Sequence, residues 1–254
     1  MSYNRLLNNL DELQLTKFKE QIDSYIESVN KNEMTFTDAL LELTNSELKF
    51  KDERAINACV KVGNFPFFKT DKDFDFDFQP SINKKEIMDL ISLRFIEKSE
   101  NVIFIGTPGT GKTHLATAIG IAAASKRIST YFISFQELIS QLKKASYENR
   151  LEMRIKFFCK YKLLIIDELG YLKMDDEAAN LFFQLIAKRY EKHCTVITTN
   201  SPFSKWSDIF NNPTLTNALL DRLLHHSHVI TIKGPSYRMK GKLDSIADYD
   251  NKKG

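Results

Sequence analysis

The chain has 254 residues, 43% of them hydrophobic and 11% aromatic, which is enough for a packed core and excludes a disordered chain. Its 36 basic and 33 acidic residues leave a net charge of +3, too small to indicate nucleic-acid binding yet compatible with a local basic stripe. The three widely spaced cysteines, the polar N-terminal stretch and the lack of a long apolar run lead us to expect reduced thiols and a cytoplasmic location.

Residues 1–65 have the pattern of a small helical N-terminal domain. Apolar residues recur at steps of three and four from Leu6 to Ile26, as on one face of a helix. Capping residues at Thr35–Asp38 predict a further helix through Leu43, and another helix is expected over Ser46–Val62. The charged faces of these helices are most simply solvated, and a partner- or DNA-binding role is the alternative.

Residues 66–82 break this pattern, because prolines and phenylalanines cluster there. Such a group of aromatic rings would not stay in water, so we expect an irregular aromatic linker that lies on the following domain. The alternation of Phe74, Phe76 and Phe78 with aspartates allows a short edge strand. Packing is the default role of these rings, and contact with an adenine base is an alternative. The main domain is predicted over residues 83–245, beginning with a helix at 83–97, and a flexible tail over 246–254.

A phosphate-binding loop is predicted between a buried strand, Val102–Ile105, and an Ala-rich helix, His114–Ala124. The intervening residues fit the pattern G-x-x-x-x-G-K-[ST] without a mismatch, which a chain of this length matches by chance about once in a hundred cases. The glycines let successive backbone N–H groups point inward, and the helix N-terminus adds its positive dipole end. The predicted nucleotide-binding residues are Gly106, Thr107, Pro108, Gly109, Thr110, Gly111, Lys112, Thr113 and His114.

Within this loop, Lys112 is suited to neutralise the β- and γ-phosphates of a nucleotide, and the Thr113 hydroxyl is suited to ligate Mg²⁺. An ordinary Gly-rich turn is the alternative, which the flanking strand and helix make less favourable. We therefore expect ATP and Mg²⁺ as ligands.

A second short strand is expected at Ser129–Ser134, followed by helical sequence to Phe158. This helical sequence carries the best local basic patch in the chain. The candidates for contact with DNA phosphates are Lys143, Lys144, Arg150 and Arg154. An ordinary charged helix surface explains the same residues equally well.

The sequence KLLIIDEL, residues 162–169, predicts a buried strand that ends in two carboxylates. Ligands of open α/β sheets lie at the carboxyl ends of the strands, so Asp167 is suited to hold Mg²⁺ and Glu168 to orient and deprotonate an attacking water. A strand ending in acids is common on its own, and its position after a phosphate loop is what makes the pattern specific.

Another strand is predicted at Thr195–Asn200, where Asn200 is suited either to position the water near the γ-phosphate or simply to form a turn. A helix beginning near Pro213 carries Arg222, three histidines follow it, and a last strand is expected at Val229–Ile232. A zinc site at the histidines is disfavoured, because the sequence offers no cysteine or carboxylate at suitable spacing. Repeated strand–helix units predict an α/β fold with a parallel sheet flanked by helices.

The segments GTPGTGKTHLA, LLIIDELGYL, VITTNSPFSKW and ALLDRLLHHSHVI with GPSYR together resemble the AAA+ ATPases of the IstB/DnaC group. ANLFFQLIAKRYE and DRLLHHSHVI look most like IstB-type helper ATPases of insertion-sequence transposition. The resemblance implies that Lys112 and Thr113 bind phosphate and Mg²⁺, that Asp167 and Glu168 are the metal-binding and catalytic acids, and that Asn200 senses the γ-phosphate. It also implies that Arg222 enters the site of a neighbouring subunit and that Arg238 is a second sensor in its own subunit.

An arginine supplied by a neighbour acts only when subunits stack head to tail, so the resemblance implies a multimer that grips duplex DNA and assists a transposase. The helical sequence that follows the second expected strand of this chain is similar to helices that initiator and loader proteins insert at that place. This likeness favours DNA contact by the basic patch. A DnaC-like loader of a replicative helicase is an alternative with the same site. A small-molecule P-loop kinase and a nucleotide-gated binding module without turnover are two others, and the presence of Glu168 disfavours the last.

Overall fold

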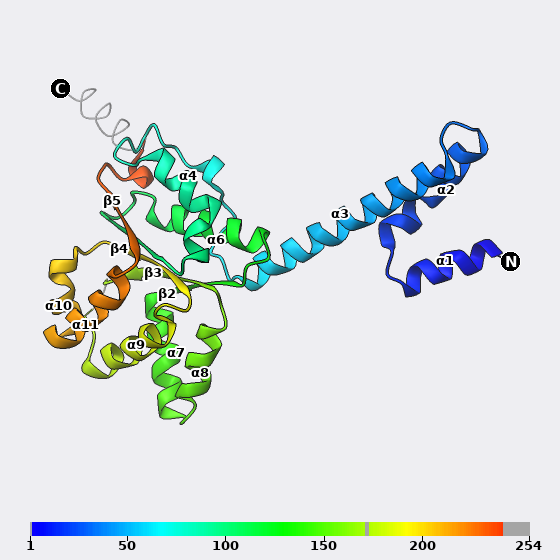
Figure 1. Ribbon diagram of the computed structural model, residues 1–254. Coiled ribbons are helices and arrows are strands. Elements are labelled where there is room, and N and C mark those ends of the chain that lie inside the picture. Colours follow the sequence, from blue (N-terminus) through cyan, green and yellow to red (C-terminus); the bar gives the residue numbers. More distant parts are fainter. Residues whose placement is uncertain (1, 171–172, 241–254) are drawn as a thin grey trace, which may run out of the picture. The chain divides into compact units, whose positions relative to one another are not determined.

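The computed structural model describes residues 2–170 and 173–240, and the predicted tail at 246–254 lies outside them. Backbone contacts divide the chain into two compact units, one ending at Ala58 and one beginning at Cys59. Figure 1 colours the first unit blue and the second from cyan to red. No helix among the described residues is long and apolar enough to cross a membrane.

The first unit is helical, as expected. It contains α1 (Ser2–Glu12), α2 (Thr16–Asn30) and most of α3 (Phe36–Val62). Leu10, Ile22 and Leu43 form its small buried core. The helices predicted to begin near residues 35 and 46 are one continuous helix, α3, because neither glycine nor proline interrupts the sequence between them.

The aromatic linker packs on the second unit, as the sequence predicted. Phe74 and Phe76 of the linker lie against its core, as does Phe65 just before the linker, although Phe68 is 69% exposed. The edge strand suggested at residues 74–78 is absent from this described segment. Instead, the Asp75 carboxylate accepts a hydrogen bond from the Phe78 N–H at 3.0 Å and turns the chain, which is the usual competition of aspartate side chains with extended structure.

The second unit is built on a parallel five-stranded sheet with the strand order β2-β3-β4-β1-β5. The strands are β1 (Asn101–Gly106), β2 (Thr130–Ser134), β3 (Leu163–Leu169), β4 (Cys194–Thr199) and β5 (Ser227–Ile232). Figure 1 shows these strands between two groups of helices. The central strands β3 and β4 are almost entirely buried, as is the middle of β1, which explains their continuous apolar sequences.

One face of the sheet packs against α4 (Lys84–Ser92), α5 (Arg94–Glu97) and α6 (Lys112–Ser125). The other face packs against α7 (Phe135–Tyr147), α8 (Leu151–Cys159), α9 (Asp176–Arg189), α10 (Trp206–Phe210) and α11 (Pro213–Leu224). Short 3-10 turns occur at Asp71–Asp73, Phe203–Lys205 and Tyr237–Met239. The helix predicted at 83–97 is broken at Leu93, and the helical sequence predicted up to Phe158 is broken near Asn149. The backbone is left-handed at Leu93 and Asn149, with φ values of +73° and +54°.

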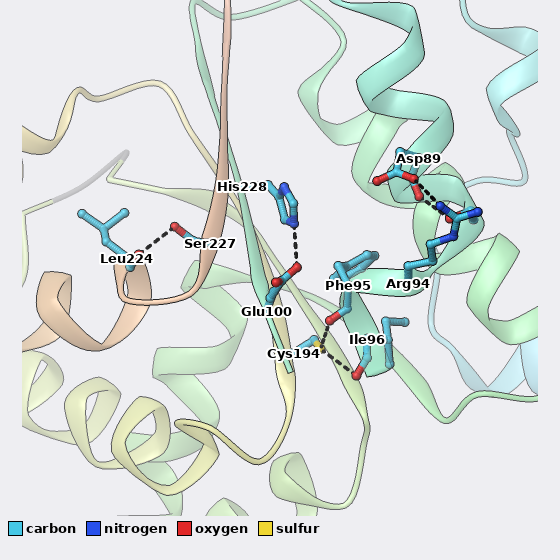
Figure 2. Close-up of polar contacts among 10 residues, drawn as sticks. Asp89, Arg94, Phe95, Ile96, Glu100, Cys194, Leu224, Ser227 and His228 are labelled. Atoms are coloured by element: carbon cyan, nitrogen blue, oxygen red, sulfur yellow. Dashed lines mark hydrogen bonds and ion pairs between the residues drawn. The ribbon is translucent and has the colours of Figure 1, made fainter. Parts of the chain in front are cut away.

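Polar contacts link strands of this sheet to neighbouring segments, at the end of the sheet where the strands begin. Figure 2 shows His228 of β5 beside the Glu100 carboxylate, 2.8 Å away, just before β1. It also shows the buried Cys194 thiol 3.7 Å from two backbone carbonyls of α5, and burial raises the pKa of this thiol to about 12. The three cysteines are all free thiols, in agreement with the sequence-based expectation.

A buried arginine ties three segments of the second unit together. The guanidinium of Arg189 donates hydrogen bonds to the carbonyls of Phe158, Tyr161 and Cys194, at 2.8, 2.9 and 2.5 Å. Burial lowers its pKa to about 10, so the group stays charged at neutral pH. The end of α8 and the starts of β3 and β4 are thereby held in register.

Candidate nucleotide-binding site

The phosphate-loop sequence joins β1 to α6, as predicted. Two of its glycines, Gly109 and Gly111, have a backbone conformation that favours glycine, and neither has room for a side chain. Gly109 and Gly111 have φ values of +83° and +96°, in the region that other residues rarely adopt. A Cβ at Gly109 would lie 2.0 Å from the Ser236 hydroxyl oxygen, and one at Gly111 would lie 2.5 Å from the Phe74 ring. The loop is therefore enclosed by the aromatic linker on one side and by the segment after β5 on the other.

Lys112 begins α6 with its ammonium group turned into the loop. Its Nζ donates hydrogen bonds to the backbone carbonyls of Gly106 and Thr107, at 2.7 and 2.8 Å. Burial lowers the pKa of this lysine, and the nearby acids Asp167 and Glu168 oppose the shift. Hydrogen bonds from an ammonium group to charged phosphate oxygens are stronger than those to neutral carbonyls, so Lys112 is suited to exchange its two carbonyl partners for phosphate.

Asp167 at the end of β3 forms the centre of a small buried network. Its carboxylate accepts hydrogen bonds from the Thr113 hydroxyl at 2.9 Å and from the Thr198 hydroxyl at 2.5 Å. Burial raises the pKa of Asp167, while the two hydroxyls act in the opposite direction. The Thr113 hydroxyl and the Asp167 carboxylate both offer hard oxygen ligands, so these two residues fit a magnesium ion.

Glu168 differs from Asp167 in burial, and the strand is irregular where both acids lie. The register of β3 against β4 shifts between Ile166 and Leu169, and Glu168 has a φ of +63°. Its N–H donates to the Thr198 hydroxyl at 2.9 Å, which fixes this unusual backbone. Asp167 is buried beside Thr113, whereas Glu168 is exposed and lines the cleft described next.

Lys112, Thr113 and Glu168 line one cleft of about 680 Å³, whereas the predicted residues Gly106, Thr107 and Asp167 are outside its lining. Its lining brings together most of the residues predicted from sequence, namely Pro108, Gly109, Thr110, Gly111, Lys112, Thr113, His114, Glu168, Asn200 and Arg238. His114 faces the linker, since its Nε2 lies 2.9 Å from the Thr70 carbonyl oxygen and its ring stands edge-on to Phe74. Asn200 is exposed, and its amide oxygen accepts a hydrogen bond from the Ser201 hydroxyl.

Arg222 lies outside the lining of this cleft. Its guanidinium donates to the Ala218 carbonyl at 2.8 Å and stacks over the Phe183 ring of α9, 4.8 Å from the ring centre.

The basic residues that the sequence proposed for DNA contact divide into two groups. Lys144, Arg150 and Arg154 line one hollow between α7 and α8, whereas Lys143 pairs with Asp175 at the start of α9.

Sequence reasoning missed Thr198, Gln136 and Tyr237. The last two line the cleft, and Thr198 bonds to both strand-tip acids. A threonine in a β-branched strand is ordinary, so no local signal distinguishes Thr198.

The sheet, the phosphate loop and the strand-tip acids define a P-loop ATPase of the AAA+ class. The solved structure of the DnaC helicase loader is similar, with a TM-score of 0.52 and 26% identity over 59% of this chain and 88% of that one. AMPPCP-bound DnaA from Aquifex aeolicus shares the fold, with a TM-score of 0.57 and 16% identity over 74% of this chain and 57% of that one.

The chain belongs to the family of IstB-like ATP binding proteins, whose pattern it matches over residues 8–245. It is 52% identical to an ATP-binding protein of insertion sequence IS232 from Bacillus thuringiensis subsp. berliner, over 94% of this chain and 96% of that relative. It is 40% identical to an ATP-binding protein of insertion sequence IS21 from Pseudomonas aeruginosa, over 92% of this chain and 88% of the relative. The resemblance stated from the sequence motifs is thus confirmed.

Proposed function

We propose that this protein is a DNA-binding ATPase that multimerises on duplex DNA and assists the transposase of an insertion sequence. The observation that carries the proposal is the shared cleft, in which the phosphate loop and Glu168 surround one space beside the Thr113–Asp167 pair. The insertion-sequence names of its relatives supply the biological setting.

Thr113 and Asp167 are the residues that would hold magnesium. Bound there, the ion supplies charge neutralisation on the phosphates of ATP. Lys112 turns from its two carbonyl partners to the β- and γ-phosphate oxygens. The backbone N–H groups of the loop and the N-terminus of α6 complete the phosphate site.

Glu168 orients the attacking water and accepts its proton, because it is the exposed carboxylate of the pair. Asn200 and Arg238 reach the same cleft and are suited to contact the γ-phosphate. Phe67 and Phe74 in the wall formed by the aromatic linker offer apolar surface to a base.

Arg222 acts on the site of a neighbouring subunit in this proposal, since it does not line the cleft of its own. Such an arginine stabilises the charge of the transition state only after assembly. Isolated subunits then hydrolyse ATP slowly, and ATP promotes a head-to-tail multimer.

The hollow between α7 and α8 is the proposed DNA contact. Lys144, Arg150 and Arg154 lie together there, and Arg150 pairs with Glu148 at an exposed position where salt or phosphate competes easily. Contacts of this kind bind the DNA backbone with little sequence preference and weaken as salt rises.

The test measures ATP turnover with and without duplex DNA while the complex is sized by light scattering. We expect DNA and ATP together to produce a large complex with faster turnover. Equal turnover and an unchanged size with and without DNA would refute the proposal. Charge-reversing variants at Arg150 and Arg154 should lose the DNA stimulation but keep the basal rate.

A second candidate is loading of a replicative helicase, which the likeness to the DnaC helicase loader favours. The catalytic site would be the same, and only the client protein would differ. Co-purification with a transposase supports the first proposal, whereas co-purification with a helicase supports the second.

A further inference from the structure

We propose that Glu191, His225 and His226 form a binding site for a zinc ion at the ends of α9 and α11. One ligand atom from each of these three side chains lies within 4.8 Å of the other two. The sequence made such a site unfavourable, because no carboxylate follows the histidines at suitable spacing. The fold supplies that carboxylate from Glu191, the second residue after α9, and α9 packs against α11 (Figure 1).

The chemistry of the three ligands favours zinc over the magnesium of the ATP cleft. Two imidazoles and one carboxylate suit a borderline metal, whereas magnesium prefers oxygen ligands alone. Three protein ligands leave a coordination position for water, as in open zinc sites. The exposure of all three side chains gives an ion direct access from solvent.

A neighbouring residue already orients one of the histidines. The Tyr190 hydroxyl lies 2.7 Å from Nδ1 of His225, and the Glu191 carboxylate lies 3.8 Å from the same nitrogen. The two imidazole rings are 4.0 Å apart between centres. Histidines that bind metals are commonly oriented by a hydrogen bond at the ring nitrogen that does not hold the ion, so the ion would bind His225 through Nε2 or take the place of the Tyr190 hydroxyl at Nδ1.

A bound ion would add a link between the ends of two helices that packing and the exposed polar contacts of His225 join in its absence. Binding to the folded chain alone raises the melting temperature, and the increase grows with the logarithm of the free zinc concentration once that concentration exceeds the dissociation constant. The proposal concerns ion binding and does not depend on DNA binding or multimer formation.

The test uses the full-length, untagged and nucleotide-free protein, titrated with zinc in competition with a chromophoric chelator. We expect one zinc ion per chain, with affinity at least tenfold weaker in His225→Asn and in Glu191→Gln. The matched controls are His193→Asn and Glu177→Gln, which change a histidine and a glutamate outside the cluster, and Asp167→Asn, which alters the ATP cleft. All three should bind zinc like the parent.

A second readout guards against misfolded variants. Zinc should raise the melting temperature of the parent and of the controls but not of the two cluster variants, and circular dichroism should show that all are folded without metal. Equal zinc affinity in the parent and in folded His225→Asn would overturn the proposal and leave the cluster as an exposed ion pair.

Discussion

The Thr198 hydroxyl donates a hydrogen bond to the Asp167 carboxylate at 2.5 Å, and its oxygen accepts one from the Glu168 N–H at 2.9 Å. A single side chain of β4 therefore holds both strand-tip acids of β3, at the point where the register between the two strands shifts. This contact fixes the backbone of Glu168 and the carboxylate of Asp167 to the same hydroxyl group. Thr198 is a positioning residue, and its influence on turnover is exerted through Glu168 and Asp167.

Replacing Thr198 by valine tests this role, because valine has nearly the same shape but no hydroxyl. We expect kcat to fall by about 10–100-fold, the usual effect of losing a partner that orients a site residue, with KM for ATP nearly unchanged. Thr198→Ser keeps the hydroxyl and should restore most of the rate. Steady-state kinetics on both variants make the comparison, and a serine variant as slow as the valine variant would show that packing is responsible.

Asp167→Asn should stabilise the protein in the absence of magnesium and nucleotide. Burial raises the pKa of Asp167, so between its unfolded and folded pKa values the folded chain binds the extra proton. Stability attributable to this group therefore falls as pH rises through that window and stays lower at neutral pH. Asparagine removes this cost but retains an oxygen that accepts hydrogen bonds from Thr113 and Thr198.

The measurement is the melting temperature of the parent and Asp167→Asn at several pH values. We expect an increase of about 2–4 °C at pH 7, which is the shift that about 1 kcal/mol gives in a domain of this size. The difference should shrink as pH falls toward the ordinary range of a carboxyl group. A variant that melts below the parent at pH 7 would contradict this account.

Glu168→Gln should retain ATP but lose hydrolysis, because the amide cannot accept the proton of the attacking water. We expect turnover to fall by about 100-fold or more. ATP-bound multimers should accumulate on DNA, which gel filtration with labelled duplex detects. Lys112→Ala provides the contrast, because it should abolish ATP binding itself. Turnover like that of the parent in Glu168→Gln would remove its assigned role as the base.

Arg222→Ala should spare nucleotide binding and lose turnover if the arginine serves a neighbouring subunit. A mixing experiment separates this from misfolding. Arg222→Ala subunits keep an intact cleft, and Lys112→Ala subunits keep the arginine, so mixing two inactive variants should restore part of the activity. Lys188→Ala, an exposed cation on α9, is the matched control. No restoration on mixing, with both variants folded, would place the role of Arg222 elsewhere.

The sequence by itself determined the elements whose residues are contiguous. Gly106–Thr113 identified the phosphate loop, and the apolar run ending at Asp167 identified the strand beside it, because a local motif and a local hydrophobic pattern need no knowledge of distant residues. The sequence also predicted that the aromatic linker packs on the main domain. The sequence-based predictions were wrong about where helices begin and end. Two predicted helices are the single helix α3, and the helix predicted at 83–97 is broken at Leu93.

The tertiary structure alone decided which distant residues meet. The register shift between Ile166 and Leu169 arises in the pairing of β3 with β4, and in that register Thr198 reaches both acids. Glu191 approaches His225 only because α9 packs against α11. Such contacts join segments far apart in the chain, and no local periodicity records them, because they arise when apolar faces are buried together and bring their polar ends into reach.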